Sequence, residues 1–456
     1  MLPLIFSVPD YQQANLIKAA ITSAFDRHPV TRRWERDPRR HVVVKPNWVQ
    51  ESHEYKQDIW EPVITHPAVL DCVLSVAAER MDGEGMISLC DAPHSYASFA
   101  GIISRGSLAE KINAFRIRWP KMNIELIDLR REIWIRREEV VFDRFANEPD
   151  PRGYVAVNLD CDSLFYGHRG EERYYGADYD AGVVRQHHRG DTHEYLLAGT
   201  PVVCDFFINV PKLKTHKKTG ITCCLKNLVG INGDKNWLPH HTEGSPDNGG
   251  DEYPDGSLPH RLETAVKKIG RAAALSAPGL GNWLYRKARN AGKRVLGDSE
   301  TTIRNGNWYG NDTCWRMALD LNRCLLYANA DGSMRDSTAS KPYLGIVDGI
   351  IGGEGNGPLC PDPVPSGVLI AGDNPAVLDA VACRLMGFDP MAVPLVREAF
   401  DSSNRWPITC DTIGAIRVWD ERVQAELKLD EVAPAIARAF KPHFGWAGHI
   451  ESRKAP

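Results

Sequence analysis

The sequence lacks the cysteine spacing of a metal–thiolate site. It has eleven cysteines, but no two of them are separated by two residues. Cys223 and Cys224 are adjacent. A zinc ribbon and a ferredoxin-type iron–sulfur cluster both need such C-x-x-C pairs. Eleven cysteines in 456 residues are also too few for a disulfide scaffold. We therefore expect reduced thiols, a cytoplasmic protein and no iron–sulfur cluster.

The sequence also lacks long apolar runs and an excess of positive charge. No uninterrupted apolar run approaches the length of a membrane span. The first residues have neither the basic flank nor the small-residue cleavage pattern of a signal peptide. A net charge of −4 argues against a general nucleic-acid binder, which is usually basic. These properties indicate a globular protein with a large core.

What is present is a central stretch, residues 202–241, in which an apolar strand is followed by cationic and polar side chains. The strand stops at Pro211, and the polar residues after it are Lys212, Lys214, Thr215, His216, Lys226 and Asn227. Ligands of open α/β sheets bind where strands end, and lysines with hydroxyls and backbone N–H groups suit an anion. The alternative is a solvated basic loop.

Other predicted strands also end in polar residues. Lys45 and Asn47 follow a strand over 41–44, and Asp91 closes a strand over 85–91. Asp348 and Glu354 lie on a glycine-rich segment after a strand over 344–347. Asp373 and Asp379 lie at the end of a strand over 367–371 and in the helix after it. Carboxylates suit a hard cation such as Mg²⁺, although turn and helix-cap roles explain them equally well.

Four motifs in order resemble one protein family. They are residues 44–47 (VKPN), 211–216 (PKLKTH) with 225–228 (LKNL), 348–358 (DGIIGGEGNGP), and Gly372-Asp373 with Ala376 and Asp379. Together they resemble the family called domain of unknown function 362, over residues 42–390. The resemblance implies a fold and a set of positions but no reaction. Some relatives carry a ferredoxin-like cluster segment, which this sequence lacks.

The order of predicted elements indicates the fold. Strands alternate with helices, which predicts an α/β fold with an open, mostly parallel, doubly wound sheet. Two separate α/β lobes, residues 36–130 and 200–390, are the alternative.

We expect a helix within residues 1–35 and the family domain over 36–390. An antiparallel flap is inserted over 130–195, and a second insertion covers 240–300. The second insertion combines a long loop, 240–257, with a basic segment, 260–296, that suits weak contact with a membrane surface. Residues 391–456 are expected to form a peripheral extension that contains a helix over 432–440.

The leading functional hypothesis is an enzyme that binds a phosphorylated or carboxylated small molecule and performs metal-assisted transfer or hydrolysis. His216 would be the general acid/base, with Lys214 and Lys226 neutralising the anion. The substrate-binding residues would be Lys45, Asn47, Lys212, Thr215, Asn227 and Arg316, the last in the first turn of a helix over 315–327. A divalent metal would be held by Asp348, Glu354, Asp373 and Asp379.

Two other classes stay open. A redox enzyme would use the thiols of Cys223 and Cys224. A non-catalytic ligand-binding protein would lie at a membrane surface through residues 260–296. Neither the substrate nor the oligomeric state follows from the sequence.

Overall fold

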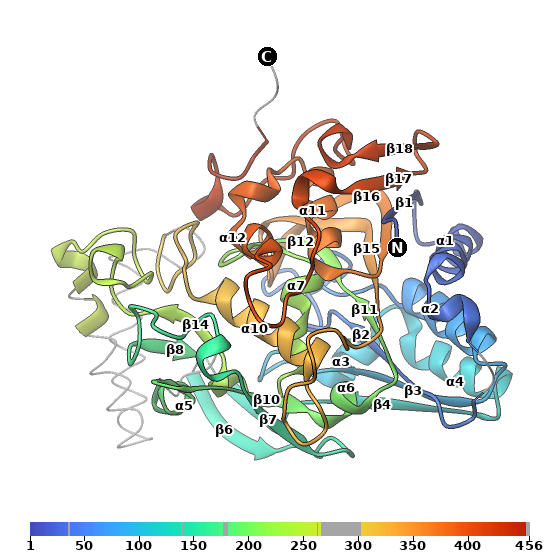
Figure 1. Ribbon diagram of the computed structural model, residues 1–456, viewed down its shortest axis with the longest axis horizontal. Coiled ribbons are helices and arrows are strands. Elements are labelled where there is room, and N and C mark those ends of the chain that lie inside the picture. The colour runs from blue at the N-terminus through green and yellow to red at the C-terminus, as the bar shows by residue number, and fades with distance from the viewer. Residues whose placement is uncertain (35–36, 138–139, 177–180, 262, 266–301, 453–456) are drawn as a thin grey trace.

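The computed structural model describes residues 1–34, 37–137, 140–176, 181–261, 263–265 and 302–452 (Figure 1). An eleven-stranded sheet forms its centre, with nine strands in the order β18-β17-β1-β16-β15-β11-β2-β3-β4. The bounds of these nine strands are β1 Leu4–Ser7, β2 His41–Pro46, β3 Gly85–Asp91, β4 Met122–Asp128, β11 Phe206–Val210, β15 Tyr343–Asn356, β16 Cys360–Gly372, β17 Arg417–Asp420 and β18 Ala425–Lys428. The remaining two, β12 (Lys212–His216) and β13 (Gly220–Thr222), are attached to β15 through β12.

The strands β4, β3, β2, β11 and β15 are parallel neighbours. From β2 the chain adds β3 and β4 on one side, whereas β11 and β15 lie on the other. The order therefore reverses between β2 and β11, and ligands of such sheets bind beyond the carboxyl ends of strands at this switch point. The predicted α/β fold with a mostly parallel sheet is confirmed. Strands of both proposed lobes lie in this one sheet.

Helices cover both faces of the sheet (Figure 1). Val42 and Val44 pack in a core with α1 (Ala14–Arg27), α2 (Pro67–Arg80) and α4 (Leu108–Arg118), whereas Val43 points to the opposite core. That opposite core includes α7 (Cys224–Asn227), α10 (Cys314–Tyr327) and α11 (Pro375–Leu385). Shorter helices are α3 Phe99–Ile103, α5 Ala181–Gln186, α6 Gly199–Val203 and α12 Pro394–Arg397. Within the described residues, none of the helices is long and apolar enough to cross a membrane.

The region predicted as an antiparallel flap forms three small antiparallel sheets with one strand of the next insertion. The strands are β5 Glu132–Arg137, β6 Val140–Ala146, β7 Tyr154–Asn158, β8 Tyr174–Gly176, β9 His188–Arg189, β10 Thr192–Ala198 and β14 Pro239–Thr242. Because β14 pairs with β8, the start of the predicted long loop is fixed to the flap. Most of the basic segment 260–296 lies outside the described residues.

The glycine-rich segment that begins at Asp348 is not a loop. It continues β15 as far as Asn356 and pairs with β16 in a long antiparallel hairpin, from Gly345 opposite Gly372 to Asn356 opposite Cys360. The glycines allow close packing there, because a Cβ on Gly349 would lie 2.9 Å from the Leu213 side chain. The sequence predicts that the strand ends at residue 347, whereas in the structure the strand continues through the glycines to Asn356.

The C-terminal extension is not peripheral to the sheet, because β17 pairs with β1 and β18 pairs with β17. The structure describes residues 432–440, and these residues do not form the predicted helix. Pro434 cannot be accommodated inside a helix, and the N–H groups of Ala435 and Phe440 donate to carbonyls of Leu385 and Met386 instead.

Candidate functional site

The switch point between β2 and β11 carries a buried polar ladder. Lys45 Nζ lies 2.8 Å from Asp91 Oδ1 at the ends of β2 and β3, and it also donates to Asn227 Oδ1 at 3.3 Å. Asn47 Nδ2 donates to the same Asn227 oxygen at 2.8 Å, and Asn227 Nδ2 donates to Asn209 Oδ1 at 2.7 Å. These bonds join three strand ends to α7. They therefore place Lys226, the residue before Asn227, at the switch point.

Lys226 is a nearly buried cation without a partner. Its surface is 7% exposed, and among the residues that the structure describes none accepts a hydrogen bond from Nζ or forms an ion pair with it. Burial lowers the pKa of Lys226, and the nearby Lys45 lowers it further, whereas Cys314 raises it. Buried ammonium groups are normally paired, so this one stands out.

Lys214 is also buried without a carboxylate. Its Nζ donates to the carbonyls of Val63 and Pro358, and burial lowers its pKa well below the ordinary value. Lys212 differs, because its Nζ lies 2.5 Å from Asp348 Oδ2 and 2.8 Å from Tyr11 Oη. Tyr11 in turn donates to the other Asp348 oxygen at 2.9 Å, so Lys212 and Asp348 neutralise each other.

Two histidines beside Lys226 hold opposite tautomers. His216 Nδ1 accepts the backbone N–H of Lys218 at 3.0 Å, so its proton is on Nε2. His240 Nδ1 lies 2.9 Å from the Leu238 carbonyl, which only accepts, so its proton is on Nδ1 and Nε2 has a free lone pair. Neither Nε2 atom has a hydrogen-bond partner among the described residues.

Burial keeps both imidazoles neutral. It lowers the pKa of His216 and of His240 well below the ordinary value, and the positive charge of Lys226 is the next cause for each. Lys218 contacts both residues: its backbone N–H donates to the His216 ring, and its Nζ donates to the backbone carbonyl of His240 at 3.2 Å. Burial lowers the pKa of Lys218 to about 8 despite nearby Asp251, whose own pKa burial raises to about 6.

Lys226, His216 and His240 together form what we call the cationic cluster. It offers an ammonium group, one imidazole N–H and one imidazole lone pair, all without protein partners among the described residues. This combination has the chemistry that suits an anion, with a proton donor and a proton acceptor in the same cluster.

The comparisons with known proteins identify the central part of the chain. The model of the family described as "Domain of unknown function (DUF362)" matches residues 171–384. The chain resembles that family over these residues, which are somewhat less than half of its length. The resemblance predicted from the motifs is confirmed, and the whole cationic cluster lies within the matched range, whereas Lys45, Asn47 and Asp91 lie before it.

Two individual similarities are more limited. The thylakoid-associated protein sll1697 of Synechocystis sp. is 41% identical over 69 residues, which are 15% of this chain. The chain matches only 22% of the length of that curated relative. The structure is also similar to a crystal structure of a Thermotoga maritima protein, with 10% sequence identity and a TM-score of 0.33. The superposed region covers 79% of this chain and 57% of the Thermotoga chain. Similarity at that level supports no conclusion.

Two predicted substrate-binding residues have other partners. Thr215 Oγ1 donates to the Gly355 carbonyl at 2.9 Å and so holds the tip of the β15–β16 hairpin. Arg316 binds both oxygens of Asp312 at 3.0 Å and donates to the Leu164 carbonyl at 3.0 Å. The structure does not bring either side chain into the cationic cluster.

The four predicted metal ligands lie in separate environments. Asp348 binds Lys212 and Tyr11, as described above, and Glu354 accepts from both terminal nitrogens of Arg438 at 2.6 and 2.8 Å. Asp379 accepts the backbone N–H groups of Cys224 and Leu225, and burial raises its pKa to about 7. The described residues therefore provide no shared metal site for these four carboxylates.

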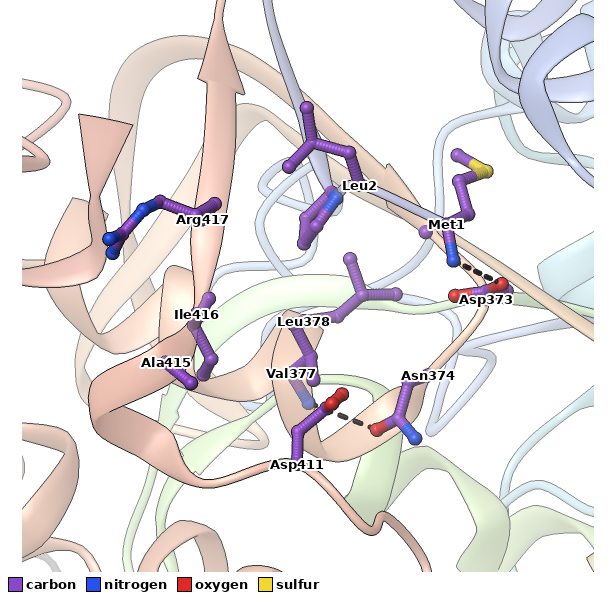
Figure 2. Close-up of a pocket in the computed structure, with 12 residues that line it drawn as sticks. Met1, Leu2, Asp373, Asn374, Val377, Leu378, Asp411, Ala415, Ile416 and Arg417 are labelled. Atoms are coloured by element: carbon purple, nitrogen blue, oxygen red, sulfur yellow. Dashed lines mark hydrogen bonds and ion pairs between the residues drawn. The ribbon is translucent and has the colours of Figure 1, made fainter. Parts of the chain in front are cut away.

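Asp373 lines a different pocket, of about 190 Å³, at the start of α11. Figure 2 shows its carboxylate toward the backbone nitrogen of Met1, and these two groups are 2.6 Å apart. Leu378 and Ile416 are among the apolar residues that line the pocket. The pocket also contains Arg417 and Asp411. It contains no residue of the cationic cluster.

Asp379 does lie beside two thiols. The sulfur atoms of Cys223 and Cys224 and a carboxylate oxygen of Asp379 are within 4.8 Å of one another, and all three side chains are buried. The thiols and the backbone N–H groups already donate to this carboxylate. The group therefore explains how the start of α7 is held in place.

Sequence reasoning missed His240 and Lys218 as parts of the site. His240 lies in a segment rich in Gly, Pro and Asp that the sequence predicts to be a long loop, yet Pro239–Thr242 pairs with β8. The one available signal was the histidine pair at 240 and 241, which follows the lysine motif in the sequence.

Proposed function

We propose that this protein is an enzyme that binds a phosphorylated or carboxylated small molecule at the cationic cluster. The observation that carries the proposal is the ammonium group of Lys226, which is 7% exposed and has no partner among the described residues. An unpaired buried cation destabilises a fold, so it is retained where a ligand supplies the missing charge.

The balance of buried charge supports an anionic ligand. Asp91 compensates Lys45, and Asp348 compensates Lys212. Lys214 is bound by carbonyls alone, and Lys226 by no described residue. An oxyanion beside Lys226 would supply negative charge and would accept hydrogen bonds from Nζ and from His216 Nε2.

Transfer or hydrolysis at the anionic group is the reaction we favour. The two neutral imidazoles supply a proton donor and a proton acceptor, the groups that general acid–base catalysis requires. The proposal does not use the predicted metal ligands, because Asp348, Glu354 and Asp379 already have protein partners. We also place the protein in the cytoplasm, since eleven free thiols, nine of them buried, suit a reducing compartment.

Thermal unfolding with inorganic phosphate tests the proposal. In the unsubstituted protein, phosphate at about ten times its Kd should stabilise the fold by about 1.4 kcal/mol. Lys226→Met should abolish this stabilisation. Without ligand, this variant should unfold at the same temperature or higher, because it loses an unpaired buried charge.

Lys341→Met is the matched control. Lys341 is also buried, at 3% exposed against 7% for Lys226, but its Nζ donates to the carbonyls of Val202 and Cys204. We expect this variant to be less stable than the unsubstituted protein but still to be stabilised by phosphate. Sulfate and small carboxylates, added in place of phosphate, show which oxyanions the site binds. An undiminished phosphate effect in Lys226→Met would exclude the cationic cluster as the binding site.

A further inference from the structure

His240 is held in a way that leaves one reactive atom free. Its Nδ1–H is donated to the Leu238 carbonyl, and Lys218 Nζ binds the carbonyl of His240 itself at 3.2 Å. The residue lies in β14, which pairs with β8. Ring and backbone are thereby both fixed, and the lone pair of Nε2 has no hydrogen-bond donor among the described residues.

The other two members of the cluster, Lys226 and His216, are donors only. Lys226 carries an ammonium group, and the tautomer of His216 puts a proton on its free Nε2. A donor cannot act as a nucleophile while its proton is in place. The cluster therefore contains one imidazole nucleophile and two groups that can bind the oxygens of an electrophile.

We infer that His240 Nε2 is the nucleophile of the site and accepts a phosphoryl group, whose oxygens are bound by Lys226 and by His216 Nε2–H. This rests on the proposed function and narrows its substrate class to a phosphorylated compound. An imidazole nucleophile fixed by a carbonyl and surrounded by cationic donors suits the attack on phosphorus.

The step balances in atoms and charge. The Nε2 lone pair of His240 forms the N–P bond while the P–O bond to the leaving group breaks. The leaving oxygen keeps that electron pair and takes a proton from the Lys226 ammonium group. Water then attacks phosphorus, the N–P electrons return to Nε2, and the proton lost by water returns to the Lys226 amine, with inorganic phosphate as the product.

The full-length protein incubated with phosphoramidate, a small phosphoryl donor, tests the inference. Peptide mapping should find the phosphoryl group on His240, and none should form at that position in His240→Asn or His240→Gln. His449, which is exposed and stacks on Tyr309, is the internal reference. We expect His240 to be labelled about 100-fold faster than His449, a factor typical of one well-placed charge-stabilising donor.

Lys226→Met should slow the labelling of His240 by about 100-fold, because it removes one charge-stabilising donor. Inorganic phosphate should protect His240 of the unsubstituted protein from labelling. Equal labelling of His240 and His449, or an unchanged rate in Lys226→Met, would overturn the inference. If phosphate stabilises the protein through Lys226 but His240 is not labelled, only the nucleophile is wrong. If phosphate neither stabilises nor protects, the proposed function fails as well.

Discussion

Gly230 packs directly on the buried ion pair between Lys45 and Asp91. A Cβ at this glycine would lie 1.9 Å from Asp91 Oδ1 and 2.6 Å from Lys45 Nζ. Gly230→Ala should therefore separate the pair and lower the free energy of unfolding by about 3 kcal/mol or more, because it leaves two charges unsatisfied. Urea denaturation measures the loss. Gly414→Ala, where a Cβ meets no atom within 4 Å, should change stability by less than about 0.5 kcal/mol.

The pair between Lys212 and Asp348 yields a second prediction. Both side chains are fully buried, at 0% exposed, with 2.5 Å between Nζ and Oδ2. Asp348→Ala should cost about 3 to 5 kcal/mol in urea denaturation, because it leaves the Lys212 ammonium group without its charge partner. Lys212→Met combined with Asp348→Leu should recover most of this loss. A stable Asp348→Ala protein that had lost a bound divalent metal would instead support the metal role predicted from the sequence.

Glu354 provides a milder test at the tip of the hairpin. It binds the half-exposed Arg438, and one of its oxygens accepts the backbone N–H of Lys441 at 2.9 Å. Because Arg438 is exposed to solvent, Glu354→Gln should cost only about 1 kcal/mol or less overall. Hydrogen exchange at the Lys441 amide should nevertheless become faster. The Gly355 amide, whose N–H donates to the Lys441 carbonyl, is the second position to monitor, because it belongs to the same contact. Unchanged exchange at both amides would contradict this role.

Acid should destabilise the fold through its buried histidines, and His188 is the best placed to show it. It is fully buried, its Nε2 lies 2.8 Å from the Trp237 carbonyl, and burial lowers its pKa to about 3. The unfolded residue binds a proton near pH 6.5, so folding stability falls as the pH drops from about 6.5 toward 3.

At about pH 5 this single histidine should account for about 2 kcal/mol of lost stability relative to about pH 7. We expect His188→Gln to show a pH dependence smaller by that amount in urea denaturation. His449→Gln, at an exposed position, should follow the unsubstituted protein. An identical pH profile for His188→Gln would show that His188 can be protonated in the folded state.

The regular parts of the fold were predictable because their signals are local. The apolar run that ends at Pro211 predicts β11, and the strands predicted over 41–44 and 85–91 are β2 and β3. Lys45 and Asn47 lie at the end of β2, as predicted from the strand over 41–44, and in the structure both side chains donate to Asn227 Oδ1. Here neighbours in space follow from the rules of parallel sheets.

Pairing between distant segments was not predictable in the same way. No residue near Glu354 in the sequence indicates that Arg438 is its partner. Likewise, the sequence does not indicate which of several lysines pairs with Asp348. His240 belongs to the cluster only because β14 pairs with β8, more than 60 residues earlier. A composition rich in glycine and proline predicts a loop but cannot predict such a partner.

The position of β1 also limits when the central sheet can form during synthesis. This strand pairs with β16 on one side and with β17 on the other, and β17 begins at Arg417, late in the chain. A ribosome releases β1 long before either neighbour exists, so its backbone has no sheet to join during most of synthesis. This side of the sheet, from β1 to β18, can therefore form only after β17 and β18 have been synthesised. Shortened forms that end near residue 390 should thus leave an open sheet edge beside β1 and associate with one another.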